Sequence, residues 1–259
     1  MDRLPKEITE EMQVLTTNDA RHLVDMYYSV QGYRIRAKNQ LRGAEQERDD
    51  EPPLIVGWVF GHFASLEVRI RGALNTYAKS DPVGRWSLDV CGVGPVIAAG
   101  LLAHIDITKA PTVGHIWRFA GLDPTCKWEK KTKRPFNARL KVICWHAGES
   151  FVKVKNRDGD RYGAVYAERK ALEEQRNAER AFADQAADIL KTKKIGKDTI
   201  AYAHYSEGRL PPAHIHARAK RYAVKLFLSH WHAEAYREHH GEEPPLPYPI
   251  ARLNHAHAV

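Results

Sequence analysis

Apolar residues recur every three or four positions along most of this chain, a spacing that predicts amphipathic α-helices. The first such run extends over residues 17–48, with Thr17 or Asn18 as its expected N-cap. A second run covers residues 54–79. The acidic, proline-containing segment 49–53 separates the runs, because proline cannot continue a helix. The pattern predicts two long helices that pack as an antiparallel pair.

Further helical runs follow in the rest of the chain. Thr112 is an expected N-cap and Gly121 an expected C-terminal stop, since glycine adopts the left-handed conformation that often ends a helix. Two consecutive prolines, Pro211 and Pro212, suit the start of the last run. Helices are predicted from about Pro95 and over residues 113–120, 136–154, 162–194 and 213–239.

A glycine-rich turn, Gly92-Val93-Gly94, lies between two apolar helical segments and precedes Pro95. Glycines permit a positive φ and close approach, so the N–H groups of the turn and of the next helix can point at one phosphate. The turn therefore indicates a helix-hairpin-helix that holds a DNA backbone at Gly92, Val93 and Gly94. The alternative is an ordinary glycine-rich connection between helices.

These runs together predict an all-α fold with an embedded helix-hairpin-helix. We expect a single domain over residues 1–259. Within it we expect an N-terminal helical pair over 1–85, the hairpin region over 86–154, and C-terminal helices with a proline-rich tail over 155–259.

The composition indicates the cellular compartment and the class of binding partner. The chain has 259 residues, 43% of them hydrophobic, and a net charge of +8 with a pI near 9.3, which favours a globular protein that binds nucleic acid. The three cysteines form no Cys-x-x-Cys pair, which argues against disulfides and a cysteine zinc site. No secretory signal or bilayer-length apolar run occurs, so we expect a cytoplasmic protein without membrane contact.

Basic residues cluster most densely between residues 127 and 141, where aromatic side chains interleave them. Such a cluster can neutralise phosphates and stack on bases; the alternative is a solvated loop. A second basic group lies on the predicted helix 213–239. The expected partner is double-stranded DNA, and the expected contacts besides the hairpin are Lys127, Trp128, Lys130, Lys131, Lys133, Arg134, Arg139, Lys141, Arg218 and Arg221, with Lys220 and Lys225 beside the last two.

Three carboxylates in or beside the hairpin region, Asp106, Asp123 and Glu149, are candidate catalytic groups, because a carboxylate can activate water or stabilise an oxocarbenium-like centre. Each could instead be a helix cap or an ion-pair partner. Asn39 is a further candidate that could position a water or read an extruded base. The C-terminal histidines are mostly two apart and so do not share a helix face, and we expect neither a metal nor a cofactor.

The order of motifs from Gly92-Val93-Gly94-Pro95 through Ala120-Gly121-Leu122-Asp123-Pro124 to Asn137-Ala138-Arg139-Leu140-Lys141 resembles a known arrangement. Over residues 86–154 it is similar to the C-terminal domain of bridge-RNA-guided insertion-sequence transposases. That family carries a catalytic serine just after the Gly-Leu-x-Pro element, whereas this chain has no serine between Pro124 and Ser150. The resemblance therefore implies a DNA-handling relative that lacks the transposase nucleophile.

A weaker resemblance is to the helix-hairpin-helix DNA glycosylases. Val113-Gly114-His115 echoes the start of the helix that carries their catalytic aspartate, but Gly114 stands in the place of that aspartate. Val96 stands where some members carry a catalytic lysine. The resemblance implies DNA binding, with any catalytic group elsewhere in this chain.

Our leading hypothesis from the sequence is a DNA-processing enzyme of the base-excision type, acting on modified bases of phage or foreign DNA. The first alternative is a non-catalytic DNA-binding protein of a phage or mobile element, derived from a transposase C-terminal domain. The second is a nuclease or recombinase, which would require a metal-binding carboxylate cluster or another nucleophile.

Overall fold

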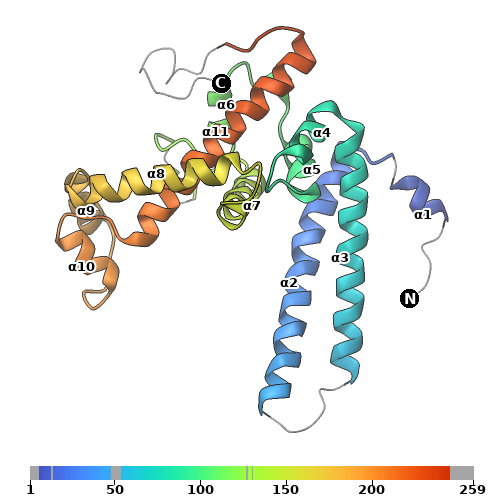
Figure 1. Cartoon of the computed structure of the whole chain (residues 1–259), viewed down its shortest axis with the longest axis horizontal. Coiled ribbons are helices and arrows are strands. Elements are labelled where there is room, and N and C mark those ends of the chain that lie inside the picture. Colours follow the sequence, from blue (N-terminus) through green and yellow to red (C-terminus); the bar gives the residue numbers. More distant parts are fainter. Residues whose placement is uncertain (1–5, 13, 48–53, 127, 130, 246–259) are drawn as a thin grey trace. The chain divides into compact units, whose positions relative to one another are not determined.

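The computed structural model describes residues 6–245 except residues 13, 48–53, 127 and 130. Every regular element among those residues is helical and none is a strand, so the predicted all-α class is confirmed (Figure 1). In chain order the elements are α1 (Lys6–Glu11), α2 (Thr17–Glu47), α3 (Leu54–Ser80), α4 (Pro82–Asp89), α5 (Pro95–His104), the 3₁₀ turn η1 (Ile107–Lys109), α6 (Val113–Phe119), α7 (Ala138–Val154), α8 (Arg161–Ala178), α9 (Ala183–Thr192), α10 (Ile200–Ser206) and α11 (Pro212–His240).

The chain divides into two compact units. The first comprises Val93–Lys109, Glu238–Gly241 and the described residues of Met1–Asp89. The second comprises Val90–Gly92, Ala110–Arg237 and the described residues of Glu242–Val259. The predicted hairpin region, 86–154, contributes to both units, and the single domain expected from the sequence stays a prediction.

The first unit is built on the predicted antiparallel pair, α2 and α3, which run side by side (Figure 1). Helix α5 packs against both of them and against α4. Eight of its ten residues are buried, because its sequence carries apolar side chains on every face. Arg21 fixes the end of α5 by donating from Nε to the carbonyl oxygen of Ala103 at 2.6 Å.

A reciprocal capping box at Thr16 starts α2, which begins at Thr17, where the predicted run begins. The Thr16 hydroxyl accepts from the Asp19 N–H at 3.2 Å, and the Asp19 carboxylate accepts from the Thr16 N–H at 3.0 Å. The expected N-cap, Thr17 or Asn18, is therefore wrong by one or two positions. The side chain of each residue thus accepts from a backbone N–H of the other that has no partner within the helix, which stabilises the first turn.

One carboxylate joins the two long helices. Glu67 of α3 accepts hydrogen bonds from three side chains of α2: Tyr27 at 3.2 Å, Gln31 at 3.1 Å, and Arg34, with which it also forms an ion pair. Burial alone would raise the pKa of Glu67, but the bonds from Arg34 and Gln31 outweigh it and lower that pKa. The ionised pair fixes the register of α2 against α3.

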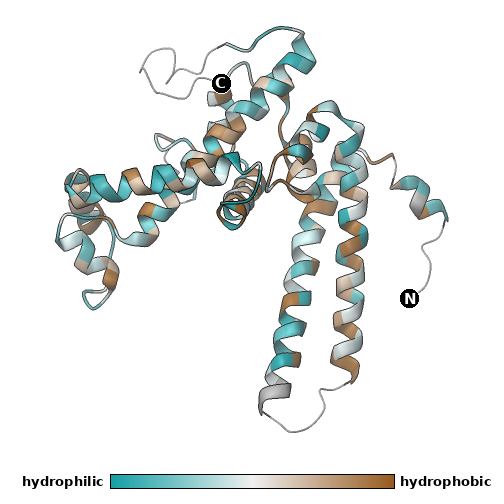
Figure 2. Ribbon diagram, viewed as in Figure 1, coloured by the Kyte–Doolittle hydropathy of each residue, from teal (hydrophilic) through white to brown (hydrophobic). Residues whose placement is uncertain are grey.

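The beginning of α3 presents apolar side chains to solvent. Hydrophobic residues recur along the ribbon of α3, including its first turns (Figure 2). Leu54, Ile55 and Trp58 are 89%, 63% and 62% exposed, whereas the buried residues of this helix all lie between Ile70 and Ala78. The apolar residues that predict this helix therefore begin at Leu54, but the described chain buries only those from Ile70 onward.

In the second unit, three aromatic rings form the centre of a core made by α7, α8 and α11. Phe151, Tyr162 and Phe227 come from these three helices in turn, and their ring centroids lie 5.0–5.3 Å apart. All three side chains are buried. Such offset and edge-on contacts add to the free energy gained from burying the rings.

The single helix expected over residues 162–194 is wrong, because the chain breaks it into α8 and α9. Arg180 lies in the break with a φ of 57°, and the ring of Phe182 turns into the core. Phe182 packs in a cluster with Ile189, Leu210 and Ile215. Burying this ring outweighs the helix propensity of the residues around it. The helices α1 and α10 were not predicted from the spacing.

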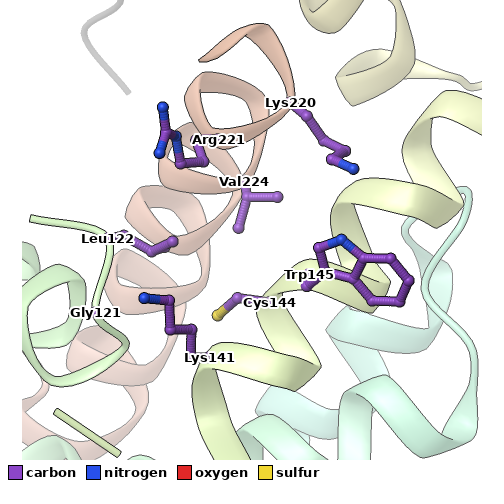
Figure 3. A pocket seen from close by; sticks show the side chains of 8 residues that line it. All are labelled: Gly121, Leu122, Lys141, Cys144, Trp145, Lys220, Arg221 and Val224. Atoms are coloured by element: carbon purple, nitrogen blue, oxygen red, sulfur yellow. The ribbon is translucent and has the colours of Figure 1, made fainter. Parts of the chain in front are cut away.

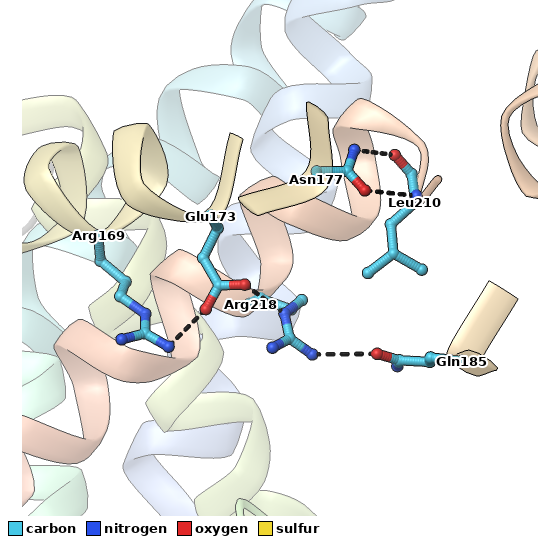
Figure 4. A network of polar contacts seen from close by, with 6 residues as sticks. All are labelled: Arg169, Glu173, Asn177, Gln185, Leu210 and Arg218. Carbon is cyan, nitrogen blue, oxygen red and sulfur yellow. Dashed lines mark hydrogen bonds and ion pairs between the residues drawn. The ribbon is translucent and has the colours of Figure 1, made fainter. Parts of the chain in front are cut away.

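A buried carboxylate ties α8 to α11 (Figure 4). Glu173, which is 1% exposed, forms ion pairs with Arg169 of its own helix and with Arg218 of α11, the latter at 2.8 Å. Arg218 also donates to the side-chain oxygen of Gln185 in α9 at 3.3 Å. Nearby, the side-chain amide of Asn177 bonds both the N–H and the carbonyl oxygen of Leu210, at 2.8 and 2.9 Å. These contacts satisfy the polar groups in this part of the core.

Two histidines of α11 pair with tyrosines of α8. The hydroxyl groups of Tyr162 and Tyr166 lie 2.6 and 2.7 Å from Nδ1 of His230 and His216, respectively. Burial, aided by the charge of Arg161, lowers the pKa of His230 from 6.5 to about 4. Folding therefore keeps this imidazole neutral.

Because the folded pKa of His230 lies below its unfolded value, its contribution to stability is complete above about pH 6.5 and is lost as the pH falls toward 4. We expect the free energy of unfolding in urea to decrease between about pH 7.5 and about pH 4.5. His230→Gln should flatten this decrease, and His239→Gln, at an exposed position, should not. An unchanged pH dependence in His230→Gln would contradict this assignment.

None of the described helices combines the length and the apolar character needed to cross a membrane.

Candidate nucleic-acid interface

The turn between α4 and α5 has a left-handed residue at Gly92, with a φ of +91°, as the hairpin hypothesis expects. Gly94 instead has a φ of −96° and a ψ of 175°, an extended conformation open to any residue. The positive φ that glycine permits is thus adopted at Gly92 and not at Gly94. The side chain of Val93 between them is buried.

Gly92 is held by α7. Its carbonyl oxygen accepts from the Ser150 hydroxyl at 2.6 Å, and a Cβ added to it would lie 3.0 Å from Val154 and 3.2 Å from Phe151. This close approach explains why glycine stands here in structural terms alone. A role of Gly92, Val93 and Gly94 in DNA binding stays a prediction.

The basic segment between α6 and α7 folds back on itself. Trp128 donates from its indole nitrogen to the carbonyl oxygen of Thr132 at 2.9 Å, and the guanidinium of Arg134 lies 5.3 Å from the indole centroid. The side chains of Lys131, Lys133 and Arg134 are exposed. The expected contacts Lys127 and Lys130 lie outside the described residues. This segment, residues 123–137, is called the basic loop below.

Asn137 ends the basic loop and caps α7. Its side-chain oxygen accepts from the N–H groups of Arg139 and Leu140 at 2.9 and 3.1 Å. Helix α7 therefore begins at Ala138, two residues after the expected start. The cap fixes where Lys141 emerges in the first turns of the helix.

Lys141 lines a partly enclosed cavity of about 140 Å³ in the second unit (Figure 3). The cavity lies between the end of α6, helix α7 and helix α11. Three of its side chains are cations, one is an indole and the others are small or apolar. We call it the basic pocket, and its lining residues are Gly121, Leu122, Lys141, Cys144, Trp145, Lys220, Arg221 and Val224.

Two glycines let these walls come together. Gly121 has a φ of +66°, and a Cβ there would lie 2.9 Å from the ring of Phe136 and 3.1 Å from the side chain of Lys141. A Cβ at Gly148 would lie 2.7 Å from Lys220. The absence of these two side chains allows Lys141 and Lys220 to lie against their neighbours.

The cations of the basic pocket differ in their partners. Lys220 forms an ion pair with Glu149, and its ammonium lies 5.5 Å from the centroid of Trp145. Lys141 lies 4.4 Å from the ring centroid of Phe136. No ion pair joins Lys141 or Arg221 to a carboxylate among the residues that the structure describes.

The charge of Arg221 lies in unfavourable surroundings. Desolvation and the neighbouring charge of Arg218 both lower its pKa, although a guanidinium stays protonated under all ordinary conditions. Burial raises the pKa of the Cys144 thiol to about 12, so that this group remains uncharged at the bottom of the pocket. The side chain of Arg221 is nevertheless exposed, so an anion that enters the pocket can reach its charge.

The candidate catalytic carboxylates are each bound to neighbouring groups. Asp106 accepts from Thr108 and pairs with Lys109, Asp123 accepts from Thr125, and Glu149 pairs with Lys220. Hydrogen bonds from these partners lower the pKa of all three carboxylates.

The four candidate catalytic residues also fall in different units. Asn39, exposed on α2, and Asp106 belong to the first unit, and Asp123 and Glu149 to the second. Base excision gains no support from this placement and stays a prediction.

The remaining expected contact on α11, Arg218, is engaged in the ion pair with Glu173 and lies 4.5 Å from the ring of Phe182. Its guanidinium therefore already serves the packing of α8, α9 and α11. No cluster of three metal-ligating side chains occurs in the described part of the chain.

Sequence reasoning missed Trp145 and Cys144. The indole of Trp145 is 54% exposed at the basic pocket and follows Lys141 by four positions, which places both on one face of α7. That spacing was a usable signal. The position of Cys144 in the pocket depends on how α7 meets α11, which no local pattern reveals.

The fold and the pocket define an all-α protein with a cation-lined cavity between three helical segments. No family model, no curated protein and no solved structure shows a significant match to the chain.

Proposed function

We propose that this protein binds double-stranded DNA through its phosphates, and that the basic pocket is the main contact. The observation that carries this proposal is a concave site with two cations, Lys141 and Arg221, that form no ion pair within the described chain. Cations without a carboxylate partner, held at a concave surface, favour an anionic ligand.

The basic loop extends the positive charge beyond the pocket. Leu122, just before the loop, and Lys141, just after it, both line the pocket. The basic loop therefore leaves the chain near the pocket and returns near it, and it carries the exposed cations Lys131, Lys133 and Arg134. An anion that continues past the pocket, as a DNA backbone does, can meet these charges in succession.

Exposed indoles accompany the cations. Trp145 is 54% exposed beside the pocket and Trp128 is 45% exposed in the basic loop. Interleaved cations and aromatic rings are typical of nucleic-acid contacts, in which the rings stack on bases or sugars.

The basic pocket is smaller than the pockets that enclose drug-sized ligands. Pockets that enclose a drug-sized ligand measure about 300–1,000 Å³. The basic pocket, at about 140 Å³, suits a single phosphate group. The candidate catalytic carboxylates are all engaged by neighbouring groups and are divided between the two units, so binding, the first alternative from the sequence, is the function we propose.

Lys141→Gln and Arg221→Gln are each expected to weaken binding of a short labelled duplex about tenfold, because each removes one charge-assisted hydrogen bond to a phosphate. Fluorescence anisotropy titrations over a range of salt concentrations measure this effect. The slope of log affinity against log salt should decrease by about 1 in each variant.

Lys191→Gln on α9 is the matched control, since it removes an exposed cation of the same unit outside the pocket and the basic loop. It should change affinity less than about twofold. Equal weakening in all three variants would show that net charge alone is responsible, and salt-independent or absent duplex binding would overturn the proposal.

A further inference from the structure

We infer that the basic pocket accepts the terminal phosphate of a DNA strand, a phosphomonoester, in preference to the internal phosphodiesters. This inference rests on the proposed function and names the part of the DNA that enters the pocket. Charge, shape and the position of one indole support it independently.

The charge of the pocket matches a monoester. Glu149 neutralises Lys220, which leaves Lys141 and Arg221 as the pocket cations without an ion pair in the described chain. A phosphomonoester carries about −1.5 to −2 charges at neutral pH, and an internal diester carries one. A dianionic group can therefore compensate both cations, whereas a diester can compensate only one.

The shape of the pocket favours a chain end. The buried thiol of Cys144 and the side chain of Val224 belong to its lining, and its volume is about 140 Å³. A terminal phosphate is attached to one sugar and can enter with three of its oxygen atoms leading. An internal phosphate carries a sugar on each side, so both would have to fit between α7 and α11. The partly enclosed pocket therefore favours the terminal group.

Trp145 offers an exposed aromatic surface beside the pocket. Its indole is half exposed at the pocket, and the ammonium of Lys220, fixed by Glu149, lies 5.5 Å from the ring centroid. A duplex end presents the open face of its last base pair, which can stack on an exposed indole. Inside a duplex that face is covered by the next pair, so this contact is specific to an end.

The uncharged state of Cys144 agrees with an anion in the pocket. Burial raises the pKa of its thiol to about 12, so no thiolate charge opposes a phosphate there. The same protonated state excludes this cysteine as a ready nucleophile toward the bound phosphate.

The test compares three DNAs with one sequence by competition against a labelled duplex. One is a blunt duplex with terminal phosphates, one has terminal hydroxyl groups, and one is closed at both ends by hairpin loops. We expect the phosphorylated duplex to bind about tenfold more tightly than the other two, as loss of a charge-assisted contact implies. Placing the phosphate at the 5′ or the 3′ end then identifies the strand terminus that is bound.

The preference for phosphorylated ends should disappear in Lys141→Gln and Arg221→Gln and persist in Lys191→Gln. Trp145→Ala should weaken binding of the blunt duplexes more than binding of the closed one. The comparison among DNAs on the unaltered protein needs no variant, so it stands even if a variant folds poorly.

The other outcomes separate this inference from the proposed function. If all three DNAs bind with equal affinity and Lys141→Gln weakens the binding of each, end recognition would be overturned and the proposed DNA binding would remain supported. Displacement by inorganic phosphate at the same concentration as the phosphorylated duplex would identify a site for free phosphate and overturn the inference. Absence of binding to every DNA would overturn both proposals.

Discussion

Glu173→Gln is expected to lower the free energy of unfolding by about 3 kcal/mol. The substitution removes the negative charge of a buried side chain with which two guanidinium groups form ion pairs. Glu173 is 1% exposed, and its partners Arg169 and Arg218 are each 25% exposed. The pKa of Glu173 is lowered despite burial, since Arg218 and Arg169 outweigh the desolvation. Urea denaturation at neutral pH measures the loss.

The neighbouring Glu174→Gln is the matched control. Glu174 is 55% exposed and pairs with Lys170 at 3.3 Å, an ion pair of the kind that contributes less than about 1 kcal/mol. Its replacement should change stability by no more than about 0.5 kcal/mol. Similar unfolding curves for the two variants would show that the Glu173 ion pairs do not hold α8 against α11.

Gly92→Ala is expected to destabilise the protein by about 2–3 kcal/mol, for two reasons that add. A φ of +91° is unfavourable for any residue with a Cβ, by about 1–2 kcal/mol. The new methyl group would also lie 3.0 Å from Val154 and 3.2 Å from Phe151, so the core of α7 would have to shift. Thermal and urea unfolding both measure the effect.

Gly94→Ala is the paired substitution in the same turn. Gly94 has an ordinary extended conformation, and no atom lies within 4 Å of a Cβ added there. Its stability should stay within about 0.5 kcal/mol of the parent protein. If Gly94→Ala were the more damaging of the two, the conformations assigned to this turn would be wrong.

Much of the fold could be predicted because strong local signals bound the helices. The expected start of α3 at Leu54 is confirmed, and the predicted last helix began one residue after the observed start of α11 at Pro212. The end of α6 before Gly121 was also predicted, from the tolerance of glycine for positive φ. Each of these signals acts within a few residues of the boundary that it sets.

The break between α8 and α9 could not be predicted in this way. The residues around it favour a helix, and the reason for the break is tertiary. The ring of Phe182 lies between the guanidinium groups of Arg176 and Arg218, 5.2 and 4.5 Å from its centroid. Arg218 belongs to a helix far along the chain, so no window of sequence around residue 180 contains the cause.

The sequence could predict cations that belong to the candidate site, but it could not predict how they are arranged. Lys141 and Arg221 were both expected contacts, and the pocket brings them together. Arg218, three positions from Arg221 on α11, faces Glu173 instead. Which cation meets a carboxylate depends on the packing of α8, which the charge pattern of α11 does not encode.

The thiol of Cys144 gives the second unit a built-in chemical probe. It is fully buried, and its protonated state makes it slow to react with alkylating reagents. A reagent reaches this sulfur either through the basic pocket or through transient opening of the helices, so the rate of modification reports how accessible the pocket and the helix packing leave it. A ligand that joins Lys141 to Arg221 would bridge α7 and α11 and slow that reaction, which makes the labelling rate of a single sulfur atom a measure of occupancy beside it.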